Sequence, residues 1–79
     1  MEENRKVRLT KKVLKETLVE LLLVKNIAKI SVTELCDKAD VNRSTFYSHY
    51  SGLEAVLNEI EDELAEWIFD LTSKIRGIV

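Results

Sequence analysis

The chain has 79 residues, of which 46% are hydrophobic and 33% are charged, and its formal net charge is −2. This composition is typical of one small globular domain and excludes a disordered or membrane-embedded chain. The longest purely apolar run, Leu21 to Val24, is too short to cross a bilayer, and the amino terminus has no apolar signal-peptide core. We therefore expect a cytoplasmic protein.

The chain offers little material for catalysis. Cys36 is the only cysteine and His49 the only histidine, which excludes a disulfide framework within the chain and a zinc-type ligand set. We interpret Cys36 as a small buried side chain. There is no glycine-rich phosphate loop and no nucleophile with a plausible base, so we expect no enzymatic activity, metal or cofactor.

The turn-forming residues are scarce. There is no proline, and the only glycines are Gly52 and Gly77, which favours helices and predicts an all-α fold. Charge is unevenly distributed: residues 1–50 hold ten lysines and arginines against seven aspartates and glutamates, whereas residues 51–79 hold two against seven. The basic charge is therefore concentrated in the amino-terminal part of the chain.

The first helix is predicted to begin after Thr10 as its N-cap. Leucines and valines recur at helical spacing after this threonine, and Leu9 and Leu14 stand at the positions of a hydrophobic staple. The pattern ends near Lys25 and Asn26.

Two later helices carry capping-box signals. Ser31 followed by Glu34 predicts a second helix from about Val32 to Ala39. Ser51 followed by Glu54 predicts the start of a fourth helix, whose apolar residues keep a 3.6-residue period for about 25 residues.

A short third helix lies between them. Asn42 is a good N-cap for a helix from Arg43 to about His49, and the connection after Ala39 is only a few residues long. Asp40 occupies this sharp corner, where a left-handed conformation is expected, and Cys36 is small enough for two helices to cross closely. This is the spacing of a helix-turn-helix.

The third helix has two different faces. Phe46 and Tyr50 are four residues apart and are expected to pack inward. The residues left on the outer face carry hydrogen-bond donors and little negative charge: Arg43, Ser44, Thr45, Tyr47, Ser48 and His49. Such a surface suits base edges and phosphates of DNA, because arginine can pair with guanine and hydroxyls can bind bases or backbone oxygens.

The stretch "SVTELCDKADVNRSTFYSHYSGLEAVL" resembles the DNA-binding domain of TetR-type transcriptional regulators, over roughly residues 10–65. Its most specific part, "VNRSTFYSHY", is similar to the family signature V-x-x-x-T-[FLI]-Y-x-[HY]-[FY]. The resemblance implies a three-helix head with a short recognition helix in the major groove, a fourth helix leading to a ligand-binding and dimerising domain, and a two-fold dimer on a palindromic operator. It assigns DNA contacts to Thr33, Asn42, Arg43, Ser44, Thr45, Tyr47 and His49.

Within this assignment, Arg43, Ser44 and Thr45 face base edges or the nearby backbone. The resemblance places Tyr47 and His49 at phosphates or at the edge of the groove, and Thr33, at the start of the second helix, at a phosphate. Three cations in a flexible basic arm, residues 1–9, either add contacts or form a solvated tail: Arg5, Lys6 and Arg8.

The chain departs from the family pattern at three points. Asp40 stands where the family usually has glycine, and Leu53 stands where it often has a phosphate-binding lysine. After the head, residues 10–52, only the fourth helix, residues 53–79, remains. The domain that would bind an inducer is expected to lie outside this chain. The alternative interpretation is a TetR-like protein-interaction module with weak or lost DNA binding.

The last part of the fourth helix carries Trp67, Ile68, Leu71 and Ile75, for which the head offers no partner. We expect these side chains to be exposed or to be buried against a second copy, as a two-fold pair of fourth helices.

Overall fold

The computed structural model describes residues 4–78 of the chain. It contains α1 (Arg5–Leu22), a 3-10 turn η1 (Ile27–Lys29), α2 (Val32–Ala39), α3 (Arg43–His49) and α4 (Leu53–Ile78). No strand occurs among the described residues. The expected all-α class is confirmed, and the bounds predicted for the second and third helices agree with α2 and α3.

The start of α1 differs from the prediction. Asn4, not Thr10, is the N-cap: its side-chain oxygen accepts a hydrogen bond from the Val7 N–H at 2.9 Å. Thr10 lies inside the helix, where its hydroxyl donates to the Lys6 carbonyl. The expected staple is also wrong, since Leu9 is 55% exposed. Asn and Thr are both acceptable N-caps, so the sequence offered two candidates, and the prediction chose Thr10 instead of Asn4.

The basic arm expected over residues 1–9 is therefore helical from Arg5 onward. Three cations lie exposed on the first turns of α1: Arg5, Lys6 and Arg8. Residues 1–3 lie outside the described residues.

The segment between α1 and α2 contains a 3-10 turn, η1, that was not predicted from the sequence. α1 ends at Leu22, earlier than expected, and η1 follows with Asn26 as its cap. Ser31 then caps α2 as predicted, accepting from the Glu34 N–H at 3.0 Å. The Glu34 carboxylate pairs with the ammonium of Lys25.

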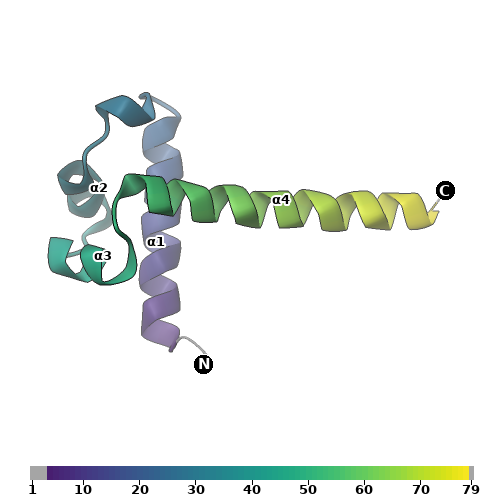
Figure 1. Ribbon diagram of the computed structural model, residues 1–79, viewed down its shortest axis with the longest axis horizontal. Coiled ribbons are helices and arrows are strands. Elements are labelled where there is room, and N and C mark those ends of the chain that lie inside the picture. Colours follow the sequence, from purple (N-terminus) through teal and green to yellow (C-terminus); the bar gives the residue numbers. More distant parts are fainter. Residues whose placement is uncertain (1–3, 79) are drawn as a thin grey trace.

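The core draws on every helix. α1 packs against both α2 and α4, and α2 packs against α3. Figure 1 shows α1 standing upright, with α2 and α3 on one side of it and α4 crossing its middle and extending to the other side. Five side chains are fully buried at this junction: Leu14, Leu18, Leu35, Phe46 and Val56. Because these five come from all four helices, the short helices are stabilised by tertiary packing rather than by their own length.

α4 has a packed half and a projecting half. Four apolar residues of its first two turns contact or enter the core, as expected: Leu53, Val56, Leu57 and Ile60. From residue 61 to residue 77 every side chain is exposed. Figure 1 shows this half extending away from the three-helix head, and the molecule measures 48 Å along its longest axis. None of the helices in residues 4–78 is long and apolar enough to cross a membrane.

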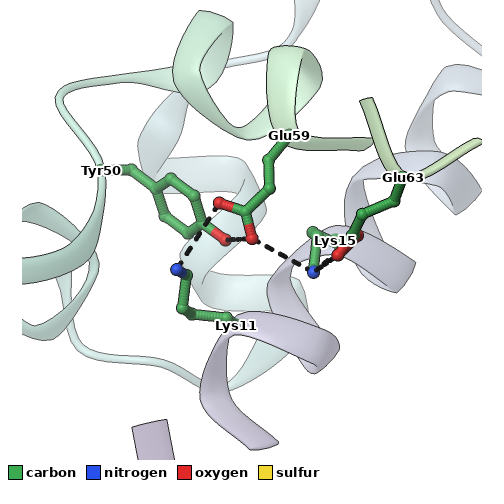
Figure 2. Close-up of polar contacts among 5 residues, drawn as sticks. All are labelled: Lys11, Lys15, Tyr50, Glu59 and Glu63. Atoms are coloured by element: carbon green, nitrogen blue, oxygen red, sulfur yellow. Dashed lines mark hydrogen bonds and ion pairs between the residues drawn. The ribbon is translucent and has the colours of Figure 1, made fainter. Parts of the chain in front are cut away.

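A polar network joins α4 to the head (Figure 2). The Glu59 carboxylate on α4 accepts hydrogen bonds from the Lys15 ammonium at 3.2 Å and from the Tyr50 hydroxyl at 3.4 Å. It also pairs with Lys11 at 3.5 Å, and Glu63 pairs with Lys15. The network thus joins α1, the end of α3 and α4.

The Lys15 ammonium is held in its charged form by this network. Burial acts to lower the pKa of Lys15, but hydrogen bonds to Glu63 and Glu59 and the charges of both carboxylates raise it, and the net pKa is raised. Two of the six cations in residues 5–15, Lys11 and Lys15, are therefore paired with carboxylates of α4.

Candidate nucleic-acid interface

The corner between α2 and α3 is made by a left-handed residue, as predicted. Asp40 has φ 57° and ψ 45°, and its N–H donates to the Asp37 carbonyl. The Val41 N–H donates to the Cys36 carbonyl at 2.9 Å. This pair of bonds is a Schellman motif, which ends α2 and turns the chain toward α3 within a few residues.

Small side chains fill the crossing of α2 and α3. Cys36 is 2% exposed and Ala39 is partly buried against the core. Burial raises the pKa of the Cys36 thiol, while the charge of Arg43 acts to lower it and that of Asp37 to raise it. A buried neutral thiol packs as a small apolar group, which confirms the structural interpretation of Cys36.

α3 is held from its inner face. Phe46 is fully buried and Tyr50 is 5% exposed, as expected, with their ring centroids 5.7 Å apart. Asn42 caps the helix: its side-chain oxygen accepts from the Ser44 N–H and from the Ser44 hydroxyl, each at 2.8 Å. A helix of seven residues is thus fixed in place by two aromatic rings and a cap.

Most of the candidate DNA-binding residues lie together on the outer side of α3. Five of them are exposed: Asn42, Arg43, Ser44, Thr45 and Tyr47. His49 is half-buried. Thr33 is also exposed, but it lies on the first turn of α2, at the opposite end of that helix from the corner.

The donors of this surface are not equally available. Asn42 and Ser44 are engaged with each other at the cap, and the Ser48 hydroxyl donates to the Thr45 carbonyl at 2.6 Å. The Arg43 guanidinium has no hydrogen bond or ion pair within residues 4–78. Tyr47 is 49% exposed, and its ring meets Phe46 edge-on at 5.2 Å between centroids. The Arg43 guanidinium and the Tyr47 hydroxyl are therefore exposed and have no hydrogen bond within residues 4–78.

The electrostatics of the surface are mixed. A shallow groove beside the start of α3 is lined by Cys36, Asp37, Asp40, Val41 and Asn42. The two exposed carboxylates of this groove, those of Asp37 and Asp40, would repel the phosphate backbone of DNA. The sequence places both aspartates within six positions of Arg43, but only the folded corner brings them to the lining of this groove. Among residues 4–78 no group of acidic, histidine and cysteine side chains could hold a metal ion.

The left-handed corner predicts a measurable strain. We expect Asp40→Gly to raise the free energy of unfolding by about 0.5 to 1 kcal/mol, because glycine adopts positive φ without the steric cost that aspartate incurs. Urea denaturation followed by circular dichroism measures the shift. Asp37→Gly is the matched control: it removes a carboxylate from a right-handed helical position and should lower the free energy by about 1 kcal/mol. A lower urea midpoint for Asp40→Gly would contradict the assignment of strain to this residue.

Comparisons of the chain with protein-family models, with curated proteins and with solved structures find no match. A functional assignment therefore rests on the residues of this chain.

Proposed function

We propose that this chain is the DNA-binding part of a TetR-type transcriptional regulator, most simply a repressor, and that α3 enters the major groove. The observation that carries the proposal is the pairing of α2 and α3 across the left-handed corner at Asp40. Behind α3, Phe46 and Tyr50 are buried, and in front of it Arg43 is exposed and without an internal partner.

The dimensions of α3 suit this role. An α-helix with its side chains is about 10 to 12 Å in diameter, which fits a major groove about 12 Å wide. The first turn of α3 holds Arg43, Ser44 and Thr45, and recognition helices of this class read bases from their amino-terminal residues. Arg43 is suited to bidentate hydrogen bonds with a guanine, whereas the Thr45 methyl group can contact a thymine methyl.

The remaining candidate residues are assigned to position rather than to sequence. Tyr47 and His49 follow at the middle and end of α3 and Thr33 stands on α2, where hydroxyl and imidazole groups can donate to phosphates. Asn42 acts through its cap, since it holds the first turn of α3 in helical form. The exposed start of α1 adds positive charge through Arg5 and its neighbours.

The proposal extends to a palindromic operator in double-stranded DNA and to a homodimer of the full-length regulator. An inducer would bind a domain outside this chain. The proposal places the protein in the cytoplasm and assigns it no catalytic role.

The second candidate function is a protein-interaction module with weak or lost DNA binding. Two observations favour it. Asp37 and Asp40 are exposed beside the start of α3. Leu53, which stands where the resemblance implies a phosphate-binding lysine, packs against the core.

Selection from a random duplex library, followed by titration of the selected sequence at two salt concentrations, tests the proposal. Specific binding predicts an enriched, palindromic sequence and a steep fall in affinity with salt. Lys29→Ala is a suitable control, because Lys29 is an exposed cation on η1, outside α3 and α4, and its loss should leave the selected sequence unchanged. No enrichment and no salt dependence would favour the interaction module.

The position of Tyr47 gives a second expected result. Tyr47→Phe should weaken binding to every duplex by about 0.5 to 1.5 kcal/mol with little change in preference, because it removes one phosphate hydrogen bond. The ring, with its edge-on contact to Phe46, remains in place. Fluorescence anisotropy on the selected and a scrambled duplex measures both affinities. A change in the ratio of the two affinities would instead assign Tyr47 to base recognition.

A further inference from the structure

The projecting half of α4 carries an apolar surface that nothing in the described chain covers. Its side chains remain between 44% and 54% exposed: Leu64, Ile68, Leu71 and Ile75. We call these four residues the α4 stripe. Trp67 borders the stripe and is 61% exposed. The expectation that Trp67, Ile68, Leu71 and Ile75 lack a partner in the head is thereby confirmed.

The spacing of the stripe is that of a helix pair. Its members follow one another at intervals of four, three and four residues, which is the alternation of the two seam positions in a coiled coil. Phe69 is 71% exposed but falls outside this alternation. The stripe therefore has the spacing expected for the contact between two paired helices.

The charges of α4 distinguish between the two orientations of such a pair. Residues 53–70 carry seven acidic side chains and no basic one. Residues 71–79 carry Lys74 and Arg76 and no acidic side chain. A parallel pair places the acidic segments side by side, where they repel each other. An antiparallel pair places the basic end of each helix beside the acidic segment of the other.

We propose that two copies of this chain associate through the α4 stripe as an antiparallel two-fold pair. In the register that aligns the seam, Leu64 lies opposite Ile75 of the partner subunit and Ile68 lies opposite Leu71 of the partner subunit. The two-fold axis repeats both of these residue pairs, so every stripe residue faces an apolar side chain of the partner helix. This inference does not depend on the proposed function.

The shape of the molecule accommodates this pair. α4 projects clear of α1, α2 and α3 (Figure 1), and the paired segment begins where the contacts with the head end. In the proposed register the two heads lie at opposite ends of the paired segment.

Sedimentation velocity of the 79-residue chain over a range of concentrations tests the pairing. We expect a monomer–dimer equilibrium and a blue shift of Trp67 fluorescence as the dimer forms, since Trp67 is the only tryptophan. Ile68→Ser should raise the dissociation constant by about tenfold or more, because each dimer loses two buried side chains. Phe69→Ser is the matched control and should leave the constant unchanged. Both positions are exposed in the single chain, so circular dichroism should show the head intact in both variants.

The orientation has its own test. For the antiparallel pair, Lys74→Glu combined with Arg76→Glu should abolish association, and added salt should weaken the dimer of the original chain. A parallel pair would instead be strengthened by salt, which would overturn the proposed orientation. A monomer at all concentrations, or equal effects of Ile68→Ser and Phe69→Ser, would overturn the pairing itself.

Discussion

Phe46→Ala is expected to lower the free energy of unfolding by about 3 to 5 kcal/mol. Phe46 is fully buried and contacts the rings of both Tyr47 and Tyr50. Small domains are stable by only about 5 to 15 kcal/mol in total, so the variant should lose a large fraction of its stability. Because α3 is too short to persist without its inner face, the loss also removes the candidate interface.

Chemical denaturation followed by far-ultraviolet circular dichroism measures this effect. Tyr47→Ala is the matched control, since it truncates the adjacent aromatic residue on the exposed side of the same helix. We expect Tyr47→Ala to cost much less stability than Phe46→Ala. Similar losses for the two variants would mean that α3 is not held by its inner face, and the orientation of α3 described above would be wrong.

Arg43→Ala is expected to reduce the preference for the selected operator over a random duplex by about 1 to 3 kcal/mol. The guanidinium is exposed at the first position of α3 and has no hydrogen-bond or ion-pair partner within residues 4–78. A base contact made by this group discriminates between sequences, whereas a phosphate contact would not. The expected loss is therefore larger on the operator than on the random duplex.

Anisotropy titrations of both duplexes at one fixed salt concentration measure the two losses. Arg5→Ala provides the control, because it also removes one exposed cation but from the first turn of α1. It should weaken both complexes by the same factor. Equal losses on the two duplexes for Arg43→Ala would reassign this residue to the DNA backbone.

Local signals in the sequence were sufficient for most helix boundaries. Ser31 and Asn42 cap α2 and α3 as predicted, and Asp40 adopts the expected left-handed conformation. Each of these features depends on hydrogen bonds between residues no more than five positions apart. The failure at the start of α1 has the same origin, since Asn4 and Thr10 both offer a capping oxygen and the chain used the earlier one.

The candidate site was only partly foreseen. The sequence placed Phe46 and Tyr50 inward and Arg43 outward, because a 3.6-residue period separates the faces of a helix. It did not indicate that Ser44 is engaged with Asn42, or that Asp37 and Asp40 line the groove beside α3. Those facts depend on side-chain conformation and on how the corner folds.

The sequence by itself determined that the chain is all-α, where α2 and α3 lie, and that the end of α4 has an apolar stripe without a partner in the head. These properties follow from caps, periodicity and the absence of proline, which act over a few residues. Only the tertiary structure decided which cations remain available. Lys15 is neutralised by Glu59 and Glu63, which lie 44 and 48 residues away along the chain. The same long-range pairs join α1 to α4, and contacts between residues so far apart leave no signal in local spacing.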